Sequence, residues 1–588
     1  MNRSPSGDGG TSMLSLRRIF LKSVWLTSLV CFLPSPVAAM QGQTVSFTMD
    51  RSKLFGGTTR QITVYVPAEY TGKEPACVYI GLDGLLFDVP TVFDDLIRRH
   101  EMPVTIAVGV DPGTVNSSRS PENPRYDRSL EFDGLNDHLA RFILEEVLPA
   151  VERRKTPSGL PIRLSENPND RAVGGASTGG IGAFLLGWER PDAFRRIFSA
   201  IGTFVGMRGG DQLPVLVRKT EPKPLRIFLQ DGSHDEWMNG PEMGDWWLGN
   251  QSMLSALRFA GYDVRHVWGE GAHDDAQAAE IFPDAMRWLW RGWPEEIPVG
   301  VSKNTVLETI LLPSEGWHEL PGDFRAEGSL ASGNRGEVAF QEASTGRIGI
   351  IAPSGSVVLS GPFSDPSSPL AFGPHGELYG NDPPSGSVVV RTGSGPERTI
   401  ARGLSASCLL TAADGRLYLT ESGVNHDGRL WMIPRGGAPR LLDQGLNEPQ
   451  GVALSPDGLW LAVFEHGSHT GFSYRVLADG GTADRQKFYW LHVPDSADDS
   501  GAGECAVDCD GLLYVATRLG VQICDRNGRS RAILPVPGGE VVGVAFGGTD
   551  FQTLHVVCAD HRIYTRKLKA KGWPPWAGPI KLPHGAPG

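Results

Sequence analysis

The residues best suited to chemistry lie in the stretch Arg171–Gly180, which reads RAVGGASTGG. Ser177 stands in a G-x-S-x-G pattern, after the apolar pair Ala172-Val173 and before the helix-like run Ile181–Leu186. A serine on a sharp turn between a strand and a helix has strained backbone angles, and side chains two residues to either side would clash. The spacing therefore predicts a nucleophilic serine on a strand–turn–helix unit.

An acid and a histidine follow the next predicted strands downstream of Ser177. The segment QDGSHD ends at Asp235 and the segment GEGAH ends at His273. A serine nucleophile needs a base that takes its proton and a carboxylate that fixes the base's tautomer and stabilises its cation. We expect His273 to be the base and Asp235 the acid, with Asp231 as the alternative acid.

Two backbone N–H groups must stabilise the oxyanion that forms when a serine attacks a carbonyl. The first is expected from Thr178, the residue after the nucleophile. The second is expected from the loop GLDGL, which leaves the apolar run Val78–Leu82. Gly84 and Leu85 are the candidates in that loop, and the sequence does not choose between them.

Strand-like and helix-like runs alternate through residues 40–300, which predicts a mostly parallel sheet with helices on both faces. The predicted strands are Val78–Leu82, Thr105–Val110, Ala172–Gly174, Ile197–Ile201, Leu225–Leu229 and Asp263–Trp268. The predicted helices are Leu135–Glu152, Gly180–Trp188, Gln251–Phe259 and Pro283–Trp290.

These motifs resemble the enterochelin-esterase-like family of α/β-hydrolases along nearly the whole of this region. The resemblance implies an α/β-hydrolase domain with serine esterase activity, and it supports Asp235 over Asp231. It also implies a role near the cleft entrance for the pair Arg128 and Glu131, for which a helix-capping ion pair is the alternative. The matching stretches are Ile80–Gly84, Arg128–Phe132, Gly175–Gly180, Trp188–Pro191, Gln230–Asp235 and Gly269–His273.

A turn followed by a strand recurs six times in residues 305–575, at a spacing of roughly 40 to 53 residues, which is typical of four-stranded propeller blades. We therefore expect an all-β, six-bladed propeller, followed by a tail at 576–588. The six copies are Arg335–Ala339, His375–Tyr379, Asp414–Tyr418, Asp457–Trp460, Asp510–Tyr514 and the weaker Phe551–His555.

The propeller region resembles the gluconolactonase/regucalcin family, whose members bind a divalent metal through a Glu, an Asn and an Asp. Glu327 matches the Glu, Gln450 stands at the Asn position, and Gly503 or, with a one-residue slip, Glu504 stands at the Asp position. A hard cation such as Ca²⁺ needs carboxylate oxygens in fixed places. We expect a degenerate propeller that binds substrate and holds no catalytic metal. The alternatives are a metal-dependent sugar lactonase and a non-catalytic carbohydrate-binding protein.

The chain of 588 residues has a net charge of −12 and no basic tract, which argues against nucleic acid as a partner. Residues 1–39 resemble a twin-arginine signal peptide, with Arg17-Arg18, the apolar run Val24–Leu33 and the cleavage signal Val37-Ala38-Ala39. We expect recognition by the twin-arginine export machinery, a periplasmic or secreted protein, no permanent membrane anchor, and a small-molecule or carbohydrate ester as substrate.

Overall fold

The computed structural model describes residues 41–116, 123–236, 241–362, 369–382, 385–393, 395–423, 425 and 427–583. The predicted signal peptide at 1–39 lies outside these residues. Within the described ranges, no helix has the length and apolar character needed to cross a membrane.

The first half of the chain forms an eight-stranded sheet in the order β1-β2-β4-β3-β7-β8-β9-β10. The six predicted strands are all in it and pair in parallel, while β1 and β2 add an antiparallel edge that the sequence analysis did not predict. The strands are β1 Gln43–Met49, β2 Arg60–Val66, β3 Cys77–Leu82, β4 Thr105–Val110, β7 Arg171–Ala176, β8 Arg196–Ala200, β9 Arg226–Gly232 and β10 Asp263–Gly269. A separate two-residue pair joins β5 (Thr114–Val115) to β6 (Arg125–Tyr126).

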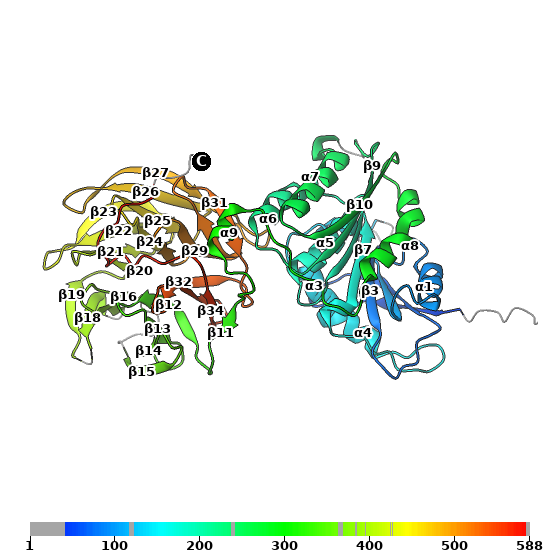
Figure 1. Cartoon of the computed structure of the whole chain (residues 1–588), viewed down its shortest axis with the longest axis horizontal. Helices are drawn as coiled ribbons and strands as arrows, with labels where there is room; N and C mark the ends of the chain where they lie inside the picture. The colour runs from blue at the N-terminus through cyan, green and yellow to red at the C-terminus, as the bar shows by residue number, and fades with distance from the viewer. Residues whose placement is uncertain are drawn as a thin grey trace, which may run out of the picture. The chain divides into compact units, whose positions relative to one another are not determined.

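Helices cover both faces of this sheet (Figure 1). Strand β3 shows why, because Val78 and Ile80 pack into one core and Cys77 and Tyr79 pack into the other. Helices α1 (Val89–Arg98) and α8 (Ala276–Trp290) belong to the Tyr79 side. On the opposite side lie α2 Arg128–Phe132, α3 His138–Phe142, α4 Leu148–Glu152, α5 Thr178–Glu189, α6 Leu213–Lys219 and α7 Trp246–Phe259.

The helix predicted over Leu135–Glu152 differs from the observed one. It begins at His138 and contains a π-helical turn at Ile143–Val147 between α3 and α4. Pro149 follows that turn, and a proline lacks the N–H for an intrahelical bond and clashes with the carbonyl four residues earlier. The wider π turn provides the space that the proline ring requires.

The second half of the chain forms six four-stranded antiparallel sheets, which confirms the predicted six-bladed β-propeller (Figure 1). The short strand β11 (His318–Glu319) pairs with β34, so the last blade combines the start and the end of the propeller. The blades in chain order are as follows: β12 Ala326–Ser332, β13 Val338–Glu342, β14 Arg347–Ile351, β15 Val357–Pro362; β16 Ala371–Phe372, β17 Glu377–Asp382, β18 Ser387–Thr392, β19 Arg398–Arg402; β20 Cys408–Thr411, β21 Leu417–Glu421, β22 Gly428–Ile433, β23 Arg440–Leu446; β24 Pro449–Leu454, β25 Trp460–Glu465, β26 Thr470–Val476, β27 Thr482–Trp490; β28 Cys505–Val507, β29 Leu513–Thr517, β30 Gly520–Cys524, β31 Ser530–Leu534; and β32 Val541–Gly547, β33 Thr553–Cys558, β34 Ile563–Lys567 with β11. A short helix, α9 (Thr305–Ile310), precedes them.

Each repeated motif lies at the hairpin between the first and second strands of a blade. In five blades a glycine occupies the turn with a positive φ, as at Gly336 (82°) and Gly511 (81°). The sixth motif has Phe551 at φ 56° instead, which explains why it matched the pattern weakly.

Candidate active site

Ser177 lies at the turn between β7 and α5, with φ 59° and ψ −124°. The neighbouring glycines have no room for a side chain. A Cβ at Gly175 would lie 2.5 Å from the Gly179 carbonyl oxygen, and one at Gly179 would lie 2.8 Å from Asp83 Oδ2. The G-x-S-x-G spacing therefore reflects steric exclusion around a strained serine.

The structure brings Ser177, His273 and Asp235 together. His273 Nε2 lies 2.8 Å from Ser177 Oγ, and His273 Nδ1 lies 2.9 Å from each carboxylate oxygen of Asp235. The Asp235 side chain is fully buried, and that of His273 is 8% exposed. The Trp246 ring contacts the imidazole edge-on, with 5.7 Å between ring centroids. The base is thus shielded from water and held from two sides.

Two adjacent loops supply the acid and the base. Strands β9 and β10 pair in parallel, and the loops that follow them remain in contact. The Ser233 N–H donates to the Gly269 carbonyl at 2.9 Å, and the His234 N–H donates to the Gly271 carbonyl at 3.0 Å. Because the carboxyl ends of parallel strands meet at one edge of the sheet, this pairing places both loops beside the turn after β7.

The alternative acid, Asp231, does not contact His273 in this arrangement. It lies in β9, fully buried, and its Oδ1 accepts the Gly232 N–H at 2.8 Å. Burial, with a smaller contribution from the neighbouring Asp235 carboxylate, raises the pKa of Asp231 well above its usual range.

The predicted oxyanion donors lie on the two segments that flank Ser177. Thr178 is the first residue of α5, and its hydroxyl donates to Asp133 Oδ2 at 3.3 Å. Gly84 has φ 87°, and its N–H donates to the Val110 carbonyl at 3.4 Å. That long bond engages the Gly84 amide, whereas the Leu85 N–H donates to no backbone carbonyl of the described residues.

Arg128 and Glu131 lie on the same short helix but do not pair with each other, so the alternative of a helix-capping ion pair between them is wrong. Arg128 donates two 2.7 Å bonds to Asp83 and a third, at 3.3 Å, to the Ala176 carbonyl. Glu131 is buried and accepts from both terminal nitrogens of Arg60, at 2.6 and 2.7 Å. Each residue finds a stronger partner on another element, and only Arg128 lies next to the nucleophile turn.

Four residues that support the site were not singled out from the sequence. Asp83 pairs with Arg128, Arg60 pairs with Glu131, Trp246 contacts the base, and Asp133 accepts from Thr178. Asp83 belongs to the GLDGL loop, in which the glycines were the sequence signal for a backbone donor. The other three carry no local sequence signal, because Glu131 lies 71 residues from Arg60 and Thr178 lies 45 residues from Asp133, and because Trp246 meets His273 only in the folded chain.

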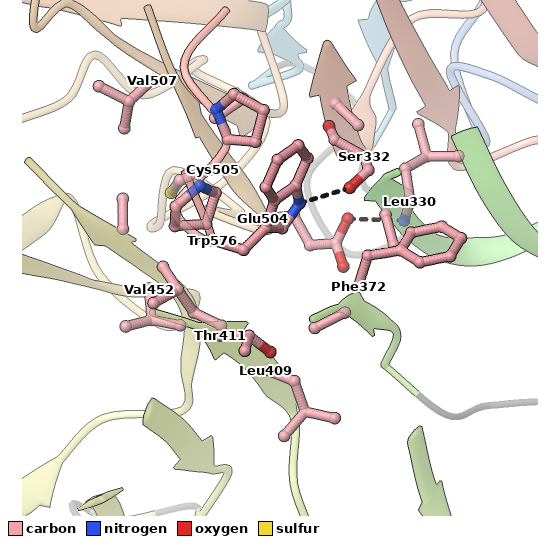
Figure 2. A pocket seen from close by; sticks show the side chains of 18 of the residues that line it. Leu330, Ser332, Phe372, Leu409, Thr411, Val452, Glu504, Cys505, Val507 and Trp576 are labelled. Atoms are coloured by element: carbon pink, nitrogen blue, oxygen red, sulfur yellow. Dashed lines mark hydrogen bonds between the residues drawn. The ribbon is translucent and has the colours of Figure 1, made fainter. Parts of the chain in front are cut away.

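A second candidate site lies where the first strands of the blades meet. Figure 2 shows this cavity, of about 80 Å³, which is lined mainly by apolar side chains such as Leu330, Leu409 and Val452. The Glu504 carboxylate accepts bonds from Ser329 Oγ at 2.5 Å and from the Leu330 N–H at 2.8 Å. Burial raises the pKa of Glu504 to about 8. Of the two candidates for the Asp position, Gly503 and Glu504, it is therefore Glu504, from the register shifted by one residue, that places a carboxylate in the cavity.

The residues at this cavity do not fit a divalent metal. Glu327 and Gln450 are not among the residues that line it, and both oxygens of Glu504 already accept protein donors. No cluster of three His, Cys, Asp or Glu side chains suited to a metal occurs in the described part of the chain. The remaining lining offers too few oxygen ligands for a hard cation.

Comparisons with known proteins match the two halves separately. Residues 52–289 match the family described as "Putative esterase", and residues 407–560 match the family described as "SMP-30/Gluconolactonase/LRE-like region". A search of curated proteins found no match.

Similar solved structures also fall into two groups. A gluconolactonase from Xanthomonas campestris is 19% identical, with 45% of this chain and 92% of that chain covered, at a TM-score of 0.39. The enterobactin esterase of Shigella flexneri is 20% identical, with 42% of this chain and 59% of that chain covered, at a TM-score of 0.33. A ferulic acid esterase is 18% identical, with 43% of this chain and 99% of that chain covered, at a TM-score of 0.32. The two family matches show that the chain joins an esterase-like domain to a gluconolactonase-like β-propeller, which confirms both resemblances.

Proposed function

We propose that this protein is a serine esterase that hydrolyses carboxylic esters in an α/β-hydrolase domain. One observation carries the proposal: His273 joins Ser177 Oγ, at 2.8 Å, to the buried carboxylate of Asp235, at 2.9 Å. A nucleophile in contact with a base, and a base in contact with an orienting carboxylate, is the arrangement that acyl transfer requires.

The chemistry follows from these contacts. Ser177 Oγ attacks the ester carbonyl while His273 Nε2 takes its proton, and Asp235 stabilises the imidazolium through Nδ1–H. The imidazolium then donates that proton to the departing alcohol, which leaves an acyl group on Ser177. His273 next removes a proton from water, the hydroxide attacks the acyl carbonyl, and Ser177 leaves with the proton returned by His273.

The oxyanion of each tetrahedral intermediate would accept the backbone N–H groups of Thr178 and Leu85. Thr178 contributes the positive end of helix α5, and the loop of Leu85 is braced by the pair of Asp83 and Arg128. Neither donor requires the protein to reorganise when charge develops on the carbonyl oxygen.

We further propose that the propeller binds a carbohydrate part of the substrate. A cleft of about 990 Å³ between the blades β24–β27 and β28–β31 supports this proposal. It combines Trp460, which is 46% exposed, with planar polar side chains such as Gln486 and Asn527. An aromatic face beside groups that donate and accept hydrogen bonds suits a sugar ring. Trp460→Ala should abolish binding of soluble polysaccharides, whereas Trp490→Ala, which removes an exposed tryptophan outside the cleft, should not.

A serine-directed fluorophosphonate probe tests the catalytic proposal. It should label the peptide that contains Ser177, and Ser177→Ala should remove both the label and the hydrolysis of aryl, acetyl, feruloyl and siderophore esters. Labelling at another serine, or hydrolysis retained by Ser177→Ala, would refute the assignment.

A further inference from the structure

A second buried carboxyl group lies behind the acid of the triad. Asp231 and Asp235 are four residues apart, and both side chains are excluded from solvent. Both Asp235 oxygens face His273 Nδ1, while Asp231 Oδ1 accepts the Gly232 N–H at 2.8 Å. Asp231 Oδ2 is buried and, among the described residues, receives no donor. A buried carboxylate oxygen without a donor is costly, so this atom requires an explanation.

The surroundings supply one positive charge for two carboxyl groups. His273 can balance Asp235 when it is protonated, and no Lys or Arg in the described ion pairs reaches either aspartate. Strand β10 places Trp268 opposite Asp231 in the sheet register, and α7 presents the neutral amide of Asn250. Two adjacent carboxyl groups in a buried site cannot both ionise without a large free-energy penalty. Asp231 is the group that lacks a cation.

A proton on Asp231 Oδ2 would resolve the unpaired oxygen. Asp235 and Asn250 are the two polar side chains that act on the Asp231 carboxyl group. The Asn250 Nδ2 already donates to the carbonyls of Gly202 at 2.9 Å and Trp246 at 3.1 Å, while its Oδ1 is a second buried acceptor that receives no donor from the described residues. The carboxylate is the stronger acceptor of the two, since hydrogen bonds to ionised groups are the stronger ones.

We propose that Asp231 is a positioning residue of the triad, held as a neutral carboxylic acid that donates an O–H···O hydrogen bond to the Asp235 carboxylate. This role rests on the proposed esterase function. The bond fixes the orientation of Asp235 toward His273, and it draws negative charge from Asp235.

The direction of the pH effects follows from this bond. When Asp231 loses its proton, two carboxylates repel each other and Asp235 no longer holds His273 in place, so activity falls. Because burial raises the pKa of Asp231 well above its usual range, that loss falls on the alkaline side of the profile. Asparagine at position 231 keeps a donor at every pH, and leucine has a similar size but no donor.

The test is the pH profile of kcat/KM for the full chain and its variants on one aryl ester. Wild type should lose activity at alkaline pH, and Asp231→Asn should lack this alkaline loss. Asp231→Leu should lower kcat about tenfold across the whole profile, the worth of one hydrogen bond to a charged group. Calorimetry and end-point titration with the fluorophosphonate probe correct each rate for the folded, active fraction.

The controls separate the possible failures. Asp508→Asn removes another buried carboxyl group, in the propeller, and should leave the pH profile unchanged. If Ser177→Ala still hydrolyses the ester, the proposed esterase function fails. If Ser177→Ala is inactive but Asp231→Asn retains the wild-type alkaline limb, the role of Asp231 alone is refuted. Should Asp231→Leu fail to fold, the alkaline limb of Asp231→Asn still decides the question.

Discussion

Arg128 donates two 2.7 Å hydrogen bonds to the Asp83 carboxylate, and the same guanidinium group donates to the Ala176 carbonyl. The pair thereby ties the loop after β3 to the residue that precedes Ser177. Asp83 has φ 62° and its neighbour Gly84 has φ 87°, so this loop holds an uncommon backbone conformation. The bidentate contact therefore links the loop that carries the proposed oxyanion donor to the turn that carries Ser177.

Weakening the contact between Arg128 and Asp83 should slow catalysis without weakening substrate binding. Arg128→Lys keeps the charge but loses the bidentate geometry, and Arg128→Gln loses both. We expect kcat to fall about 10- to 100-fold, with KM little changed, because a misplaced oxyanion donor affects the transition state alone. Arg125→Gln removes a nearby exposed arginine and is the matched control. A raised KM with unchanged kcat would instead place Arg128 in contact with substrate.

The three triad residues should act as one unit. Ser177→Ala, His273→Ala and Asp235→Asn should each reduce kcat by about 10⁴-fold while leaving the fold intact. A double variant of Ser177 and His273 should be little worse than either single variant, because each change alone disables the same proton transfer. Multiplicative losses in steady-state kinetics would show that the residues act independently.

The buried pair of Arg60 and Glu131 should matter for stability rather than chemistry. Its side chains are 1% and 0% exposed, so Glu131→Gln leaves an arginine charge without a partner in the core. We expect a loss of about 3 kcal/mol in the free energy of unfolding, measured by calorimetry, with kcat per folded enzyme retained. Glu145→Gln breaks the exposed pair with Arg141 and should cost less than about 0.5 kcal/mol. Equal losses in both variants would contradict this reasoning.

The export proposal depends on residues outside the described structure. The receptor of the twin-arginine route reads the arginine pair itself, so a change that keeps the charge should still block export. We expect Arg17-Arg18→Lys-Lys to leave unprocessed precursor in the cytoplasm, detected by fractionation. Normal processing of this variant would indicate the general secretory route.

How far the sequence predicts this molecule depends on how local each signal is. Ser177 and the propeller turns were predictable because glycine spacing records steric limits within a few residues. The partners of Arg128 and Glu131 were not, since Asp83 and Arg60 lie 45 and 71 residues away and only the fold brings them close. Glu504 was predictable only as an alternative to Gly503. A one-residue shift of register changes which residue faces a given side of a strand, and the sequence did not decide between the two registers.

The last prediction concerns Glu504 and the absence of a metal requirement in the propeller. Both of its oxygens accept protein donors, from Ser329 and Leu330, in a cavity whose other walls are mostly apolar. Dialysis against a chelator should therefore change neither the melting temperature nor ester hydrolysis, and millimolar Ca²⁺ should not raise the melting temperature. A calcium-dependent shift that disappears in Glu327→Gln or Glu504→Gln would restore the metal-dependent lactonase hypothesis.

The protonation of Glu504 gives this prediction a second readout. Burial raises the pKa of Glu504 from 4.5 to about 8 in the folded protein. Between these values the folded state binds a proton that the unfolded state has lost, so this residue's contribution to stability falls as the pH rises from 4.5 to 8 and is level above 8. Glu504→Gln cannot titrate. The melting temperature of Glu504→Gln minus that of wild type, both measured by calorimetry, should therefore increase from pH 5 to pH 8. A difference independent of pH would mean that Glu504 is already ionised in the folded propeller, as a metal ligand would be.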